Sequence, residues 1–119
     1  MAKKKMILDL DTGVDDALAL AYALATPDSD LIGVVSSFGN TQVNTAGENT
    51  LKLLELLGRE DVPVFIGAAH SSTTDNFETM QVSMDIHGKN GIGDVELPTP
   101  SRSVEAQTAV DFIIEAAHK

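Results

Sequence analysis

The chain has 119 residues, of which 43% are hydrophobic, so it is long enough for one domain with a real core and too apolar to be disordered. Its 8 basic and 18 acidic residues give a formal net charge of −10, which argues against binding to a nucleic-acid backbone. A soluble acidic surface is the simplest explanation of that charge. Cysteine is absent, which excludes disulfides, thiolate metal sites and a cysteine nucleophile.

The N-terminus does not have the pattern of a secretion signal. Lys3, Lys4 and Lys5 are followed by acidic residues from Asp9 onward, before an apolar segment of sufficient length can form. No apolar run approaches the length that a transmembrane helix needs. We therefore expect a cytoplasmic protein that does not enter a membrane.

The first part of the chain alternates between strand and helix patterns. Met6 to Leu10 is typical of a short buried strand, and the Ala- and Leu-rich segment from Asp15 to Ala25 is typical of a helix, with Thr12 or an early Asp near its N-cap. Pro27 follows that helix. A second strand is predicted from Leu31 to Ser36, where β-branched residues are frequent.

A second helix is predicted from Thr41 to Leu57, with Gly58 as its C-terminal stop. Its apolar face is defined by helical spacing and comprises Val43, Ala46, Thr50, Leu53, Leu54 and Leu57. A third strand follows from Val62 to Ile66.

The final third of the chain has a weaker pattern. Residues from Gly67 to Pro100 are polar and glycine-rich, and a structureless segment of that length is uncommon unless it is functional. A last helix is predicted from Val104 to Ala117, with Ser103 as its N-cap.

The alternating order predicts a single α/β domain over residues 1–119, with a parallel sheet of three or more strands and flanking helices. No strand follows the last helix, and three strands leave an exposed sheet edge. We therefore expect the unit to be incomplete by itself.

Four aspartates, Asp9, Asp11, Asp15 and Asp16, fall within eight residues at the end of the first strand and the start of the first helix. The helix dipole favours one or two acids there, which would make them capping residues only. It does not explain four. Because carboxylates held close together repel one another, a hard divalent cation with oxygen ligands, calcium or magnesium, is the simplest explanation of the cluster.

Two other motifs begin in a similar way. An EF-hand loop that started at Asp9 would need Gly at its sixth position and Glu at its twelfth, where this chain has Val14 and Leu20. The haloacid-dehalogenase-type phosphohydrolases also have a strand followed by Asp-x-Asp, but Gly13 stands where they usually have Thr or Val. We keep that second family as a less favoured alternative.

The segment DLDTGVDDA, residues 9–17, closely resembles the N-terminal signature of the inosine-uridine nucleoside hydrolases, although that family often has Pro where Thr12 stands. Further segments agree in order, and the similarity extends over essentially the whole chain. They are Phe38-Gly39-Asn40, Val62-Pro63-Val64 and Ile86-His87-Gly88-Lys89-Asn90-Gly91. The resemblance implies a Rossmann-like nucleoside hydrolase fold of which this chain is the N-terminal part.

The resemblance also implies an activity, the calcium-dependent hydrolysis of ribonucleosides to ribose and free base. The match to Asp11 binds calcium and acts as general base, the match to Asp16 is a second calcium ligand, and the match to Asp15 binds the ribose hydroxyls. A cation lowers the pKa of bound water, and a nearby carboxylate accepts its proton. For Asp9, structural support of the cluster is as plausible as direct contact.

Two residues outside the cluster are further candidates for substrate binding. Asn40 follows the second strand and is expected at the same edge of the sheet, where we expect it to join the site; an Asx-turn or a cap before Thr41 is the less favoured alternative. His87 lies in the long polar segment and could approach the sugar or the base, or could be incidental.

Members of the resembled family continue well beyond the point at which this chain ends, and their later portion supplies further calcium ligands and ribose contacts. The alternative to an enzyme is therefore a non-catalytic module that retains cation or ribose binding. For partners we expect a ribonucleoside, together with self-association or association with the missing C-terminal portion.

Overall fold

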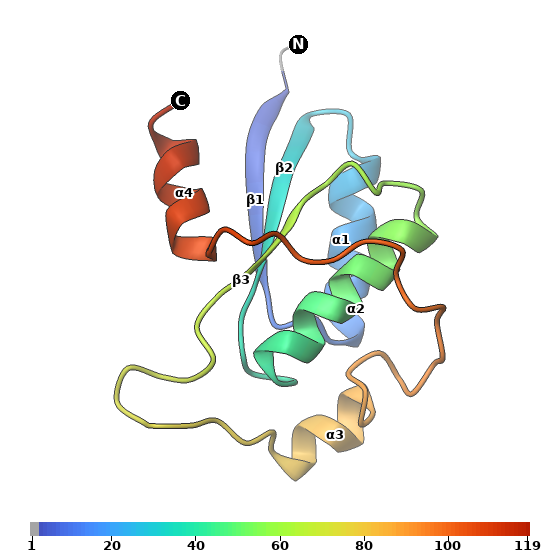
Figure 1. The fold of residues 1–119 in the computed structure, drawn as a ribbon. Coiled ribbons are helices and arrows are strands. Elements are labelled where there is room, and N and C mark those ends of the chain that lie inside the picture. The colour runs from blue at the N-terminus through green and yellow to red at the C-terminus, as the bar shows by residue number, and fades with distance from the viewer. Residues whose placement is uncertain (1–2) are drawn as a thin grey trace.

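The computed structural model describes residues 3–119, which form a three-stranded sheet and four helices (Figure 1). In chain order the elements are β1 (Lys4–Leu10), α1 (Val14–Ala25), β2 (Ser29–Ser36), α2 (Val43–Leu56), β3 (Val64–Ile66), α3 (Gln81–His87) and α4 (Ala109–Ala117).

The sheet is parallel, and its strand order is β1-β2-β3. Leu10 pairs with Ser36 and Ser36 pairs with Ile66, so all three strands end at the same level. The register between β1 and β2 shifts once, between Met6 and Ile7. The expected α/β fold with a parallel sheet is therefore confirmed, and the loops that follow the strands meet at one edge.

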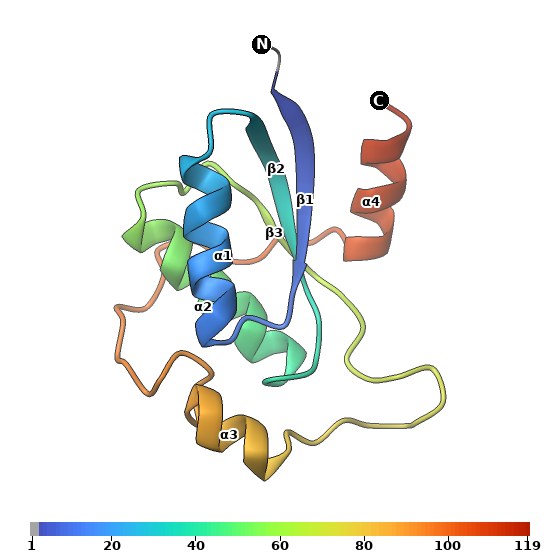
Figure 2. The same cartoon turned by 180° about the vertical axis from the view of Figure 1, so that it is seen from behind.

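One face of the sheet is covered by α1 and α2, and most of the core lies there (Figure 2). The apolar positions of both helices follow the helical period and pack against alternate residues of the strands. The buried members of this core are Leu10, Leu20, Leu31, Val34, Leu51, Leu53, Leu54, Val62, Val64 and Ile92.

The opposite face of the sheet is covered by α4 alone (Figures 1 and 2). Phe112 of this helix stacks on Phe65 of β3, with 3.8 Å between ring centroids. A side chain at Gly33 would lie 2.6 Å from the Phe112 ring, so the missing Cβ at this position makes room for the helix.

The prediction for the last helix was wrong at its start. The helix begins at Ala109 rather than Val104, and its N-cap is Thr108, whose hydroxyl accepts a hydrogen bond from the Asp111 N–H. The preceding residues are held in another way, since the Glu105 N–H donates to the Val64 carbonyl at 2.8 Å. That bond to β3 keeps the segment out of the helix.

The segment predicted to lack regular structure contains α3, which the sequence pattern did not indicate. None of the residues of α3 is buried, so no apolar face marks this helix. A smaller correction concerns Leu57, which caps α2 and is 41% exposed, although its spacing places it with the apolar face.

The remaining boundaries agree with the sequence to within a residue or two. The N-cap of α1 is Gly13 rather than Thr12 or an Asp. Over residues 3–119, no helix has both the length and the apolar character needed to cross a bilayer.

Candidate functional site

The candidate site lies where the strands end. Residues 11–16, which join β1 to α1 and include the first turn of that helix, are called the Asp loop. Residues 87–95, which comprise the last residue of α3 and the segment after it, are called the His loop. Figures 1 and 2 both show α3 at the end of the sheet where α1 and α2 begin. In open α/β sheets this end is the usual location of ligand sites.

Asp11 follows the last residue of β1 and is partly buried. Its Oδ2 accepts a hydrogen bond of 2.9 Å from the Asn40 N–H, which follows β2. Gly39 packs directly against this carboxylate. The approach is so close that any side chain at position 39 would collide with Asp11 Oδ2. The turn after β2 therefore fixes the Asp11 side chain.

Asp16 lies in the first turn of α1, close to the Asp11 carboxyl group. The Asp16 Oδ2 accepts the Gly13 N–H at 3.3 Å. Burial raises the pKa of Asp16 to about 6, and the neighbouring carboxyl groups of Asp11 and Asp15 act in the same direction. Ionised carboxylates held this close repel one another, so a positive charge between Asp11 and Asp16 would be stabilised.

The other two aspartates lie apart from this pair. The Asp15 side chain is 76% exposed and projects from the rim of the site. Asp9 is the last-but-one residue of β1, and its Oδ1 accepts a hydrogen bond from the Ser37 hydroxyl. Asp9 alternates with Leu10, so it belongs to the α4 side of the sheet. The position of Asp9 therefore favours a role in supporting the turn after β2 over direct contact with a ligand.

His87 approaches the start of α1 from the end of α3. Its Nδ1 accepts a hydrogen bond of 3.0 Å from the Val14 N–H and lies 3.9 Å from Asp15 Oδ1. Because Nδ1 is the acceptor, the neutral ring carries its proton on Nε2. The side chain is only 12% exposed, so the imidazole is a fixed part of the site.

Gly13 is the point at which these segments meet. A Cβ there would lie 2.5 Å from His87 Nδ1 and 2.8 Å from Asn40 Nδ2. The absence of a side chain therefore lets both groups reach the start of α1. The structure thus brings together Asp11, Asp16, Asn40 and His87, with Asp15 beside them.

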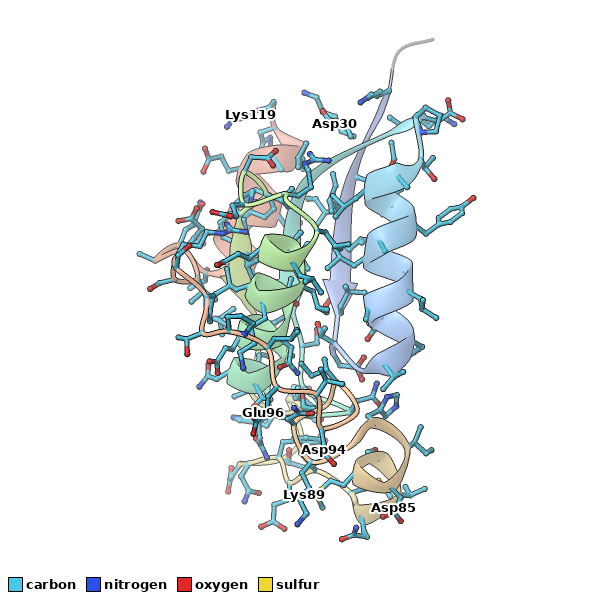
Figure 3. All side chains as sticks on the ribbon, turned by 90° about the vertical axis from the view of Figure 1, so that its right-hand side faces the viewer. Asp30, Asp85, Lys89, Asp94, Glu96 and Lys119 are labelled. Atoms are coloured by element: carbon cyan, nitrogen blue, oxygen red, sulfur yellow. The ribbon has the colours of Figure 1, made fainter. Side chains whose placement is uncertain are left out.

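The His loop is held in shape by its own side chains. The Asn90 Oδ1 accepts hydrogen bonds from the N–H groups of Ile92 and Asp94, and the Asp94 Oδ1 accepts from Lys89 and Asn90. The Gly93 N–H donates to the His87 carbonyl at 2.6 Å. Figure 3 shows Lys89 and Asp94 at this end of the molecule, far from Asp30 and Lys119.

Asn49 and Thr50 were not recognised as site-supporting residues from the sequence. Both are buried polar residues of α2, and their hydrogen bonds reach the His loop and the Asp loop, respectively. Thr50 was assigned to the apolar face by its spacing. The sequence did contain a signal, which is the presence of two adjacent polar residues on a helix that packs against the sheet. Polar side chains that are buried need hydrogen-bond partners, so such a pair indicates contacts with other segments.

Among residues 3–119, no group of three or more His, Asp or Glu side chains is arranged to hold a metal ion. The Asp11–Asp16 pair nevertheless has the donor chemistry that a hard cation needs, because it places carboxylate oxygens from two residues close together. Two carboxylates are fewer than the six to eight oxygens of a usual calcium shell, so the pair by itself could not complete one.

A larger cavity lies elsewhere. It has a volume of about 550 Å³ and lies between the sheet and α4, where Lys5 of β1 and Ile32 of β2 line it. Its walls contain Phe65 and Phe112. Neither the Asp loop nor the His loop lines it, so size alone does not identify the functional site.

Comparison with known proteins gives consistent matches. The model of the inosine-uridine preferring nucleoside hydrolase family matches residues 6–119. An uncharacterised protein of Corynebacterium ammoniagenes is 54% identical over 93 residues, which are 78% of this chain and 97% of that protein. Uridine nucleosidase 1 of Arabidopsis thaliana is 40% identical over 112 residues, which are 94% of this chain and 32% of the relative.

Solved structures agree with these matches. A purine-preferring ribonucleoside hydrolase from Gardnerella vaginalis superimposes with a TM-score of 0.96 at 50% identity, over 98% of this chain and 37% of that one. A plant nucleoside hydrolase superimposes with a TM-score of 0.90 at 36% identity, over 97% of this chain and 36% of that one. The chain thus spans about a third of the length of these named hydrolases.

These matches favour the resemblance seen in the aspartate cluster over the haloacid-dehalogenase alternative. They extend over nearly all of the chain and agree between sequence and structure. The chain belongs to the inosine-uridine preferring nucleoside hydrolase family.

Proposed function

We propose that this chain carries the general base, two calcium ligands and part of the sugar site of a ribonucleoside hydrolase. The observation that supports this most strongly is the pair of neighbouring carboxyl groups of Asp11, after β1, and Asp16, in the first turn of α1, which lies beside Asn40 and His87. The names of the relatives, which include uridine nucleosidases and a purine-preferring ribonucleoside hydrolase, agree with this proposal.

The proposed reaction cleaves the N-glycosidic bond. The water oxygen forms a bond to C1′ of the ribose, the C1′–N bond breaks, and its electron pair leaves with the base, which takes up a proton. Asp11 accepts the proton that the water loses. The attack passes through an oxocarbenium-like state, as in glycoside hydrolysis.

Calcium is the cation we propose, with Asp11 and Asp16 as its ligands in this chain. When it is bound, it lowers the pKa of a water molecule and so raises the supply of hydroxide at neutral pH. The remaining oxygen positions would be filled by water or by groups outside residues 1–119.

The groups around the pair suit a sugar and its base. Asp15 is exposed and can accept hydrogen bonds from two adjacent ribose hydroxyls, which a deoxyribose could not provide. The Asn40 side-chain amide lies beside Gly13 of the Asp loop. His87 has its Nδ1 occupied by the Val14 N–H, so Nε2–H is the donor that it can offer to a substrate.

Calorimetry with calcium tests the metal assignment. We expect weak binding by the native chain and loss of the heat in an Asp11→Asn, Asp16→Asn variant. A matched control is the Asp28→Asn, Asp30→Asn variant, which removes the same charge near the start of β2, and Figure 3 shows Asp30 at the opposite end of the molecule from the His loop. Equal binding by both variants would contradict the assignment.

An activity assay separates the enzyme from the alternative, a non-catalytic module that binds a cation or ribose. That alternative is favoured by the chain's coverage of about a third of its named relatives. We expect the 119-residue chain to hydrolyse inosine or uridine very poorly, because incomplete positioning of water and sugar forfeits a large part of roughly 7–11 kcal/mol of barrier lowering. Turnover near 1 per second, abolished by Asp11→Ala, would show instead that this segment is sufficient.

Association is a further part of the proposal. Leu18 and Tyr22 on α1 and Val110 on α4 are 74%, 75% and 63% exposed, which is unusual for large apolar side chains on two different helices. We propose that these surfaces contact further protein, either other copies of the chain or the portion that its relatives have in addition. Sedimentation of the purified chain should show concentration-dependent association, and a monomer at all concentrations would contradict contact between copies.

A further inference from the structure

Two adjacent polar residues of α2 are buried in the core beneath the candidate site. Asn49 is 2% exposed and Thr50 is 0% exposed. A polar side chain in such a position is costly unless it is hydrogen-bonded, so the partners of these two groups are informative. One partner lies in the Asp loop and the other lies in the His loop.

Thr50 binds the Asp loop through a pair of hydroxyl groups. Its Oγ1 donates to the Ala46 carbonyl at 2.9 Å, and Thr12 Oγ1 lies 2.8 Å from the same oxygen. A hydroxyl has one hydrogen, so Thr12 must be the donor to Thr50. Thr12 is also fully buried and stands between Asp11 and Gly13. The bond therefore fixes the backbone from which the Asp11 side chain extends.

Asn49 binds the His loop. Its Nδ2 donates to the Asn90 carbonyl at 2.7 Å. Gly91 follows with φ +84°, a conformation that favours glycine, and a Cβ there would lie 3.0 Å from Asn49 Nδ2 and 3.3 Å from the Thr12 carbonyl. The His loop is thus pressed against both α2 and the Asp loop. Ile92, which is buried in the main core, adds an apolar anchor.

We propose that Asn49 and Thr50 are positioning residues that hold the His loop and the Asp loop in fixed relation to each other. The inference rests on the proposed function, because the groups that are held are the proposed base, cation ligands and substrate donor. Both residues are buried, so they would act through the loops that they hold and not through direct contact with a substrate.

The geometry of a helix explains why one pair can do this. Neighbouring residues on α2 are fixed 1.5 Å apart along its axis and point in different directions, so each can hold a different segment. The two loops meet at the Val14 N–H···His87 Nδ1 bond, between residues that are 73 apart in sequence. A rigid common anchor keeps that contact in place when nothing is bound.

Amide hydrogen exchange, followed by NMR on the cation-free chain, tests the inference. Thr50→Val removes the acceptor of the Thr12 hydroxyl with almost no change of shape. We expect the Gly13 and Val14 amides to exchange roughly tenfold faster, the change in local opening that a lost buried hydrogen bond produces. Thr50→Ser keeps the hydroxyl and should restore the native rate.

Asn49→Leu gives the complementary experiment. We expect the Gly93 and Asp94 amides, which are bonded within the His loop, to exchange roughly tenfold faster, with a smaller change in the Asp loop. Asn49→Ala serves the same purpose if Leu does not fit beside Gly91.

The chain contains its own matched control. Asn44 and Thr45 form the same dipeptide earlier in α2, where Asn44 is exposed and Thr45 is half-buried. Asn44→Ala, Thr45→Val should leave both loops unchanged. Val62→Ala, at a buried position outside both loops, reports how general destabilisation alone alters the amide rates.

Local acceleration in one loop supports the inference. Unchanged rates would overturn it, and so would a uniform acceleration that the Val62→Ala variant reproduces. The experiment uses neither calcium nor a nucleoside, so its failure is distinct from a failure of the proposed function.

Discussion

The two faces of the sheet differ in how completely they are covered. On the α1 and α2 face, apolar side chains from the three strands and both helices form a continuous core. The buried polar side chains of Asn49 and Thr50 join that core to the candidate site. On the α4 face the buried cluster contains only Val35, Phe65 and Ala109, and a cavity of about 550 Å³ lies under the helix. Site residues whose positions must be exact lie over the well-packed face.

This difference suggests that the molecule has a rigid half and a weakly held half. Packing density determines how much free energy a side chain contributes and how freely its element opens. We therefore expect substitutions on the α2 face to change global stability and substitutions on the α4 face to act locally. The following predictions run from the largest expected effect to the smallest.

Leu54→Ala should have the largest effect. Leu54 is completely buried in the main core, so its truncation leaves a cavity, and we expect a loss of about 3 kcal/mol in the free energy of unfolding. Urea denaturation followed by circular dichroism measures this loss. The matched control is Leu57→Ala, at a position that is 41% exposed on the same helix. Equal losses in the two variants would mean that the α2 face is not tightly packed.

Phe112→Ala should cost less, about 2 kcal/mol, because this ring is only partly buried and one wall of the cavity is already open. We expect the loss to be local, with faster amide exchange in α4 and nearly native exchange in α2. Phe112→Leu, which keeps most of the apolar contact with Phe65, should recover most of the loss. A cooperative loss of exchange protection in α2 as well would contradict the proposed division into halves.

Asp16→Asn should stabilise the protein near neutral pH. The pKa of Asp16 is about 6 in the fold and 3.8 in the ordinary state, so the folded protein holds a proton between these pH values that the unfolded chain has lost. The contribution of Asp16 to the free energy of unfolding therefore falls as the pH rises from about 4 through 6. At pH 7 the ionised carboxylate destabilises the folded protein.

Because Asp16 is only partly buried, solvent screening reduces that cost, and we expect a gain of about 1 kcal/mol for Asp16→Asn at pH 7. The gain should shrink toward zero below pH 4, where the native side chain is protonated in both states. Thermal unfolding at a series of pH values measures it, with Asp28→Asn as the control. A constant difference between pH 4 and 7 would exclude the raised pKa of Asp16 as its cause.

Asp61→Asn should have the smallest effect. The Arg59 guanidinium, which bonds to Asp61 at 3.0 Å, holds the pKa of that carboxyl below its ordinary value. Its contribution is therefore present at neutral pH and is lost as the pH falls through the lowered pKa. Both groups are exposed, so we expect a loss of less than about 0.5 kcal/mol at pH 7, removed by 1 M salt.

The elements of the well-packed half were the ones that the sequence predicted well. The first three strands and the first two helices have apolar patterns that match what they bury, so their positions agree closely with the structure. The two helices outside that half, α3 and α4, were predicted less well. The start of α4 at Ala109 depends on a backbone bond from Glu105 to β3, which no local pattern reveals, and α3 buries none of its residues.

The candidate site was predictable as a set of residues but not as an arrangement. Acidic residues after a parallel strand indicated a cation site, and the structure places Asp11 near enough to Asp16 to raise its pKa. The positions of Asn49 and Thr50 beneath the site depend on which way α2 is rotated and on a contact with Asn90, 41 residues further along the chain. Their functions and those of the aspartates stay predictions until the proposed measurements are made.

The bond between the Val14 N–H and His87 Nδ1 has a consequence for the order in which the protein folds. It joins residues 73 positions apart, and closing so long a loop costs conformational entropy that one hydrogen bond cannot offset. The contact can form only after the sheet and α2 have brought its ends together, so we expect His87 to reach its place late in folding. In a refolding experiment followed by NMR, the native imidazole signal of His87 should therefore appear after the native backbone signals of the strands. Its appearance would mark the formation of the Val14–His87 contact as a late step of folding.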